Sequence, residues 1–400
     1  MTRIRALPMM LVALWAALAT PAEAQLKGHM IRIAIGAPLS GGAASFGVEM
    51  KQAVELAIEE QNAAGGLRGA RVEANTADDE ASDAKGQAVA RAFCEDPTTL
   101  GVVGHVNSNV SIAASNIYAA CGLPMITPMS SNPVVTDRGL PNVFRLTNRD
   151  DHKGPGLAAH LYRKLGKRKA VVIDDQTVYG KGLADVFART FAALGGAIVA
   201  RPTVRVGDRD FRALLGALPK DFDVLFFGGI AEAAIVLRQM RELGQNQLFA
   251  CGDGCWNVSG FIQPAAGAAS KGEGVLVLSA APAVGRVPGS REFAERYTKK
   301  FGPIANYATN SYDSARVLLR AIEQAASTKN GMPTRAEVLA QLRALHFQGI
   351  AYPRPVEWDA KGDNKAAVIF VNVVDGDRFR EVGEITQDDL PAAPRFPLAS

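Results

Sequence analysis

Two serines stand where a carboxylate-binding site would need them, directly after short apolar runs that resemble buried strands. Ser108 follows the run that ends at Gly104, and Ser131 follows "LPMITP". A helix N-terminus presents unpaired N–H groups and a partial positive charge, so it can hold an anion. The two loops therefore predict hydroxyl and amide groups that grip the two oxygens of one carboxylate. Ser108 also fits a plain helix cap, because Ser and Asn are common there.

A carboxylate and two aromatic rings are expected near the same place. Asp253 lies in the glycine turn "CGDGC", either as a solvated turn residue or as a partner for an ammonium group. Phe46 and Tyr179 follow glycine-containing loops at strand ends, either as core residues or as apolar walls of a cleft. Together these groups would recognise a zwitterion with an apolar side chain, which is an amino acid.

The elements that would position these residues alternate regularly. Short β-branched runs alternate with helical patterns from Ile31 almost to the end of the chain, in two successive blocks. This pattern predicts an α/β fold with two domains, each a parallel sheet wrapped by helices. Ligands of such sheets bind at the carboxyl ends of the strands, where the polar loops lie. The helices are expected over residues 46–62, 83–93, 111–121, 231–243 and 310–326, with another after Tyr179.

Catalytic and nucleic-acid functions are poorly supported. The chain has no G-x-G-x-x-G, P-loop or G-x-S-x-G motif, and its five histidines show no metal-ligand or triad spacing. His105 follows a strand and could act as a base, but no nucleophile accompanies it, so a structural role is expected. The net charge is only +4, without a basic arm. We therefore expect no enzyme, metal, cofactor or nucleic-acid partner.

The N-terminus has the pattern of a secretory signal peptide. Basic residues in 1–5 precede the apolar run 6–19, and "AEA" supplies small residues for cleavage after Ala24. The apolar run is too short to span a bilayer, which needs roughly 20 residues. The sequence thus predicts a signal peptide over residues 1–24 and a mature protein in the periplasm.

Export makes disulfides chemically feasible for the four cysteines. Cys94 and Cys121 end two successive predicted helices, which can bring them together on one face of a sheet. Cys251 and Cys255 flank the glycine turn around Asp253. Both pairs are candidate disulfides, and the alternative of free thiols stays open. Their spacing does not resemble a zinc ribbon.

Seven motifs, in order, resemble the leucine/isoleucine/valine-binding proteins, which are type I periplasmic binding proteins of ABC transporters. The resemblance covers nearly the whole mature chain and is carried by "GAPLSGGAASFG", "AIEEQNAAGGLRG", "DDEASDAKGQAVA", "GHVNSNVSIAASNIY", "MITPMSSNPVVTDRG", "YGKGLA" and "GGIAEAAIVLRQMRELG". It implies two doubly wound lobes joined by three crossover strands, with the ligand between them. Lobe 1 is expected over residues 27–148 and 281–349, and lobe 2 over 149–280 and 350–400.

The resemblance also assigns roles to single residues. The carboxylate-binding hydroxyls fall on Ser108 and Ser131, the ammonium-binding acid on Asp253, and the cleft aromatics on Phe46 and Tyr179. Two further residues are expected at the site. Backbone groups of Met129 should line it, and Ile230 stands where the family often has an aromatic residue.

Two other departures from the family pattern concern the ligand site and the cysteines. Asp253 is shorter than the family's usual Glu, so the ligand must sit closer or a water must bridge. The family's common disulfide is missing, since Asn107 occupies one of its positions.

The function that follows from the resemblance is capture of an amino acid, chiefly leucine, isoleucine or valine, by closure of two lobes. The expected partner is an inner-membrane ABC permease, and the protein is expected to be a monomer. Three alternatives stay open: a larger apolar amino acid or small amide as ligand, a sensor that reports to a receptor, and an exported hydrolase.

Overall fold

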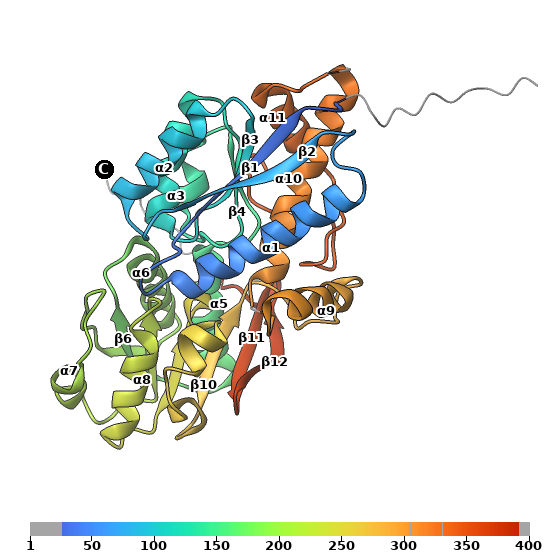
Figure 1. Cartoon of the computed structure of the whole chain (residues 1–400). Coiled ribbons are helices and arrows are strands. Elements are labelled where there is room, and N and C mark those ends of the chain that lie inside the picture. Colours follow the sequence, from blue (N-terminus) through green and yellow to red (C-terminus); the bar gives the residue numbers. More distant parts are fainter. Residues whose placement is uncertain (1–25, 305, 330, 392–400) are drawn as a thin grey trace, which may run out of the picture.

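The computed structural model describes residues 26–391 except 305 and 330, and its chain folds into two α/β lobes (Figure 1). The predicted signal peptide lies outside the described residues. The first lobe is built on a parallel sheet in the order β2-β1-β3-β4-β5. Its strands are β1 (Met30–Ala37), β2 (Arg71–Asp78), β3 (Thr99–Gly104), β4 (Met125–Thr127) and β5 (Val143–Arg145).

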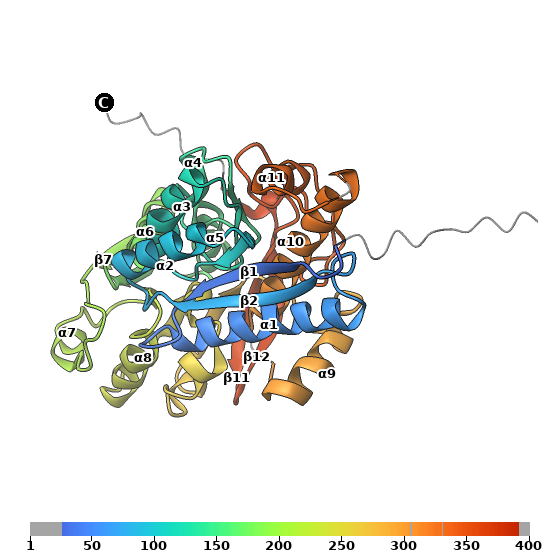
Figure 2. The ribbon, with the colours of Figure 1, turned by 45° about the horizontal axis from the view of Figure 1, so that its top comes forward.

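Helices cover both faces of this sheet because its strands bury side chains on both sides. In β1, Ile33 and Ile35 join one core cluster, whereas Ala34, between them, joins another. Figure 2 shows β1 and β2 between α2 and α3 on one side and α1 on the other. The helices of this lobe are α1 (Ala44–Ala63), α2 (Asp83–Glu95), α3 (Ser108–Ala120), α4 (Val134–Asp137), α9 (Ser290–Phe301), α10 (Ala308–Lys329) and α11 (Arg335–Arg343).

One glycine shows how closely the late helices pack on the early sheet. A Cβ on Gly101 of β3 would lie 2.5 Å from a methyl carbon of Leu318 on α10. The Leu318 side chain thus packs directly on the backbone of β3, in the space that a side chain at position 101 would take. The first lobe therefore combines chain segments about two hundred residues apart.

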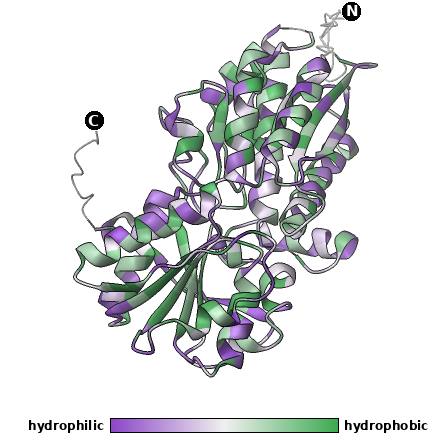
Figure 3. Ribbon diagram, turned by 90° about the vertical axis from the view of Figure 1, so that its left-hand side faces the viewer, coloured by the Kyte–Doolittle hydropathy of each residue, from purple (hydrophilic) through white to green (hydrophobic). Residues whose placement is uncertain are grey.

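The second lobe holds a sheet in the order β12-β11-β10-β9-β8-β6-β7. Figure 3 shows its strands as a largely hydrophobic layer. The strands are β6 (Lys169–Asp174), β7 (Ala197–Ala200), β8 (Val224–Gly228), β9 (Leu248–Cys251), β10 (Val275–Ser279), β11 (Ile369–Asp375) and β12 (Arg378–Ile385). Its helical segments are α5 (Asp150–Ala159), η2 (His160–Lys164), α6 (Val178–Ala193), α7 (Arg212–Gly216), α8 (Ala233–Glu242), η3 (Asp253–Cys255), η4 (Val258–Ile262), η5 (Ala268–Ser270) and η6 (Gln387–Asp389).

The predicted parallel sheet of this lobe also has an antiparallel edge. Strand β11 runs antiparallel to β10, and β12 antiparallel to β11. A two-residue turn joins β11 to β12, and such a turn can connect only antiparallel strands.

Three connections link the lobes: β5 to α5, β10 to α9, and α11 to β11. The expected lobe boundaries after residues 148, 280 and 349 lie within them. Part of the third connection departs from the expected division, because Asp363 bridges to Arg145 of β5 and the Trp358 ring packs 5.1 Å from Phe144. Residues 356–364 therefore pack on the first sheet rather than in lobe 2. No helix in the described part of the chain is both long and apolar enough to cross a bilayer.

Candidate ligand-binding site

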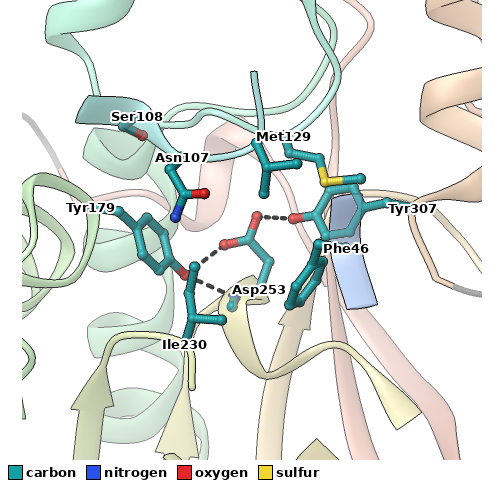
Figure 4. A pocket seen from close by; sticks show the side chains of 10 residues that line it. Phe46, Asn107, Ser108, Met129, Tyr179, Ile230, Asp253 and Tyr307 are labelled. Atoms are coloured by element: carbon teal, nitrogen blue, oxygen red, sulfur yellow. Dashed lines mark hydrogen bonds between the residues drawn. The ribbon is translucent and has the colours of Figure 1, made fainter. Parts of the chain in front are cut away.

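A cavity lies between the lobes, at the carboxyl ends of the strands of both sheets. Six of the seven predicted site residues line it, and Figure 4 shows their side chains around one space. The first lobe contributes apolar walls from α1 and from the loop after β4, and the second contributes Tyr179 of α6. The lining residues are Phe46, Val106, Asn107, Ser108, Met129, Tyr179, Ile230, Asp253, Gly254 and Tyr307.

The lobes touch around this cavity. The Asn132 side chain of the first lobe donates a 2.9 Å hydrogen bond to the carbonyl of Val178 in the second. The centre of a water molecule has only about 30 Å³ available inside. The side chains of the two lobes therefore lie close together across this space.

Ser108 is the first residue of α3 rather than its cap. The predicted helix start at residue 111 is three residues late, and Asn107 is the N-cap without a side-chain capping bond. The Ser108 hydroxyl accepts a 3.3 Å hydrogen bond from the Asn132 N–H, and its own proton remains available for another acceptor. The first N–H groups of α3 lie beside it. This end of the cavity can therefore bind a carboxylate.

Asp253 is buried at the other end, with 2% of its surface exposed, so it is not a solvated turn residue. Its Oδ1 accepts a 2.9 Å hydrogen bond from the Tyr179 hydroxyl, and its Oδ2 accepts from the Tyr307 hydroxyl and the Lys153 ammonium. Burial, followed by the charge of Asp253, raises the pKa of both tyrosines well above its usual value. Both hydroxyls therefore stay protonated and act as donors.

Comparison with known proteins decides the family. A model described as "Periplasmic binding protein" matches residues 30–377. The chain belongs to this family. The amino acid binding protein of Pseudomonas aeruginosa is 32% identical to it over 357 residues, which cover 88% of this chain and 92% of the relative. The chain spans 65% of the length of Leu/Ile/Val-binding protein homolog 2 of Brucella abortus, to which it is 38% identical over 60% of its own length.

Solved structures agree with this assignment. A leucine binding protein from Thermotoga maritima superposes with a TM-score of 0.81 at 29% identity, covering 90% of this chain and 100% of the other. A branched-chain amino acid transporter substrate binding protein from Streptococcus pneumoniae, solved with isoleucine, gives a TM-score of 0.80 at 26% identity, covering 88% and 99%. The resemblance seen in the sequence and the type I periplasmic binding protein fold are both confirmed.

Ser131 does not line the cavity. It is buried, with 1% exposure, and its carbonyl accepts a 2.9 Å hydrogen bond from the N–H of Asp150 at the start of α5. Its side chain lies against the Asp150 carboxylate, whose charged form it favours. The structure thus separates the two predicted serines: Ser108 faces the cavity, and Ser131 supports a residue behind it.

Four lining residues were not predicted at the site. Tyr307 precedes α10, and its ring packs edge-on against Phe46 with centroids 6.0 Å apart. Val106 and Gly254 flank predicted residues. Asn107 entered the sequence argument only through a missing disulfide, yet its amide faces the cavity (Figure 4), and its buried Oδ1 has no hydrogen-bond partner in the described structure. A ligand N–H can satisfy that oxygen.

Two buried charged residues behind Asp253 were also missed. Lys153 is fully buried on α5, and its ammonium lies 3.7 Å from the carboxylate of Asp150, one helical turn earlier. Burial and the negative charge of Asp253 raise the pKa of Asp150 to about 6, although Lys153 acts in the opposite direction. The charged run "RDDHKGP" directly after a strand is the signal that could have revealed them.

The cysteines and His105 have structural roles. Both candidate disulfides are formed, Cys94–Cys121 and Cys251–Cys255, and the second closes the loop that carries Asp253. His105 is buried and bonded through its two ring nitrogens to Asp79 at 2.6 Å and Tyr118 at 3.0 Å. The described residues contain no group of three or more His, Cys, Asp or Glu side chains that could hold a metal ion.

Proposed function

We propose that this chain is an exported substrate-binding protein that captures an amino acid between its lobes and delivers it to an inner-membrane ABC permease. The observation that carries the proposal is the cavity itself. An apolar wall lies between a helix N-terminus and a buried carboxylate, and the two lobes each contribute one part. The names of the relatives and of the similar structures support the same ligand class.

The ligand would lie with its carboxylate at the start of α3, where it accepts from Ser108 and the first N–H groups. Its ammonium would point toward Asp253 and the unpaired oxygen of Asn107. Phe46, Met129 and Ile230 would enclose the side chain. An aliphatic side chain fits these walls, so leucine, isoleucine and valine are the proposed ligands.

Because the walls come from both lobes, the ligand contacts all of them only when the lobes are closed. Binding therefore shifts the population from open to closed by the difference in affinity between the two states. Micromolar affinity corresponds to about −8 kcal/mol. A few charge-assisted hydrogen bonds and one buried side chain can supply that free energy.

Calorimetry of ligand-stripped, refolded protein against the twenty amino acids and short amides tests the proposal. We expect micromolar binding of leucine, isoleucine or valine. Failure of every amino acid to bind below millimolar concentration would overturn it.

Genes for a permease and an ATPase beside this one would favour transport, whereas a receptor gene would favour a sensor. Analysis of the mature N-terminus tests cleavage after Ala24, and ultracentrifugation tests the monomer.

The Ser108→Ala substitution tests the carboxylate end separately. The lost hydrogen bond to a charged group predicts about 10- to 100-fold weaker leucine binding. The free energy of unfolding should fall by about 1–3 kcal/mol, because the buried Asn132 N–H loses its acceptor, but the fold should be kept. Ser115→Ala, on the same helix but outside the cavity lining, is the control and should bind leucine normally. Equal affinities in both variants would remove Ser108 from the site.

A further inference from the structure

The carboxylate in the cavity belongs to a buried group of charges that the proposed function leaves partly unexplained. Asp150 and Lys153 lie one turn apart on α5, and Asp253 faces them from the loop after β9. Their exposures are 1%, 0% and 2%. We call these three residues the charge cluster. It contains two carboxylates and one ammonium, so it is one cation short when both acids are ionised.

The nearby arginines have other partners. Arg145 is buried and pairs with Asp363 at 2.7 Å, although it is close enough to Asp150 to favour the charged form of that carboxyl. Arg149 pairs with Asp151 at 2.7 Å and with Asp363 at 2.9 Å. Neither arginine makes an ion pair with the charge cluster in the described structure.

Asp150 is the less satisfied of the two acids. Neither of its oxygens makes a regular hydrogen bond in the described structure. The Lys153 ammonium lies 3.7 Å away, and the Ser131 side chain favours the charged form of the carboxyl. A buried carboxylate without hydrogen bonds is costly. Asp253, in contrast, accepts from three protein donors. The single ammonium is thus placed on one acid while the other lacks a close partner.

We propose that the ligand ammonium supplies the missing cation: it binds Asp253, and the Lys153 ammonium moves from Asp253 to Asp150. The required movement is small, because 3.7 Å is only about 1 Å longer than a charge-assisted hydrogen bond. After the shift each ammonium has its own carboxylate. This inference rests on the proposed function. It adds Asp150 and Lys153 as residues that determine the specificity of the site for a ligand with an ammonium group.

A requirement for the ligand ammonium follows. Leucine completes the charge cluster, whereas 4-methylpentanoate, which has the same carbon skeleton and carboxylate but no amino group, leaves it one cation short. We expect leucine to bind about 100-fold more tightly than 4-methylpentanoate, as for loss of a hydrogen-bonded charge. Calorimetry with these two compounds measures the ratio.

The Asp150→Asn substitution removes the place to which Lys153 moves. Leucine affinity should fall at least about tenfold. The ratio of the affinity for leucine to the affinity for 4-methylpentanoate should decrease. Asp151→Asn is the matched control, because it removes the same charge from the next residue of α5, where the carboxylate pairs with Arg149. It should keep the wild-type ratio. A wild-type ratio in Asp150→Asn as well would overturn the inference.

Proton release gives a second readout, which needs only the wild-type protein. Lys153 at its new position favours the charged form of Asp150 and lowers the pKa of that carboxyl from about 6. Leucine binding should therefore release about half a proton at pH 6 and none at pH 8, and affinity should fall as the pH drops below 6. Calorimetry in buffers of different ionisation enthalpy measures this release, which Asp150→Asn should abolish.

Absence of proton release at pH 6, or equal release in Asp150→Asn, would contradict the inference. Equal affinity for leucine and 4-methylpentanoate would also overturn it while leaving the binding function intact. Failure of all amino acids to bind would instead overturn the proposed function, and this inference with it.

Discussion

At the scale of single residues, three hydrogen-bond donors determine the environment of the Asp253 carboxylate. Two tyrosine hydroxyls and one ammonium hold a carboxylate that would be costly to bury alone. The Tyr179 hydroxyl also accepts a 2.8 Å hydrogen bond from the Gly254 N–H, which fixes its proton toward Asp253. Tyr179 and Lys153 belong to the same lobe as Asp253 and can orient the carboxylate before any ligand arrives, whereas Tyr307 reaches it from the first lobe.

The Tyr307→Phe substitution tests this arrangement. It removes one hydrogen bond to a charged group, so the free energy of unfolding should fall by about 1.5–3 kcal/mol. Tyr297→Phe is the control, because the Tyr297 hydroxyl donates to the neutral side chain of Gln52 at 2.7 Å. Its loss should be nearer to about 1 kcal/mol. Urea denaturation measures both, and equal losses would show that the charge of Asp253 is unimportant to stability.

At the scale of elements, the two disulfides lie in different structural contexts. Cys94–Cys121 joins the ends of α2 and α3 across 27 positions, whereas Cys251–Cys255 closes a loop of 4 positions around Asp253. Stabilisation by chain entropy grows with loop length. The first disulfide should therefore matter more for stability, and the second more for the site.

Double substitution of each pair by alanine separates these roles. Loss of Cys94–Cys121 should cost about 3.5 kcal/mol of unfolding free energy, and loss of Cys251–Cys255 about 2 kcal/mol. Only the second loss should weaken leucine binding, because it frees the backbone on both sides of Asp253. Thermal unfolding and calorimetry measure the two effects. Normal leucine affinity without Cys251–Cys255 would contradict the positioning role of that disulfide.

At the scale of the whole molecule, contact between the lobes is part of the proposed binding. A Cβ on Gly42, before α1, would lie 2.8 Å from the Cβ of Ala231 in the second lobe. A large side chain there would hold the lobes apart without entering either core. The closed state would then be less populated, and apparent affinity falls in proportion to that population.

Gly42→Trp should therefore weaken leucine binding at least about tenfold. Small-angle scattering should show a larger radius of gyration than that of the wild type with leucine. Gly216→Trp on α7 is the control, since a side chain there meets nothing within 4 Å. If Gly42→Trp binds and compacts as the wild type does, closure at this edge is not required.

The sequence predicted those residues of the candidate site that follow strands and line the cavity. Ser108, Tyr179 and Asp253 were recognisable because polar or aromatic residues at strand ends contrast with the buried strands before them. Asp150 and Lys153 were missed because charges on a helix usually face water, and only packing shows that these do not. Tyr307 was missed because it follows no strand and reaches the cavity through the returning chain.

Similar limits apply to the fold. Alternation of strands and helices predicted the two lobes, since burial on both sides of a sheet leaves a clear pattern. It did not predict the antiparallel edge formed by β11 and β12, nor the packing of residues 356–364 on β5. Those features depend on the partners of a segment in space, such as Asp363 with Arg145, which local sequence does not reveal.

The packing of α10 on β3 has a consequence for biosynthesis. Strand β3 ends at Gly104, and the helix that covers it begins at Ala308, 204 residues later. A ribosome that adds about 5–20 residues per second needs about 10–40 s for that interval. Until then α1 can cover β1 and β2, but the part of the sheet under α10 stays exposed, so the core of the first lobe is incomplete. Such a delay would suit the export proposed above.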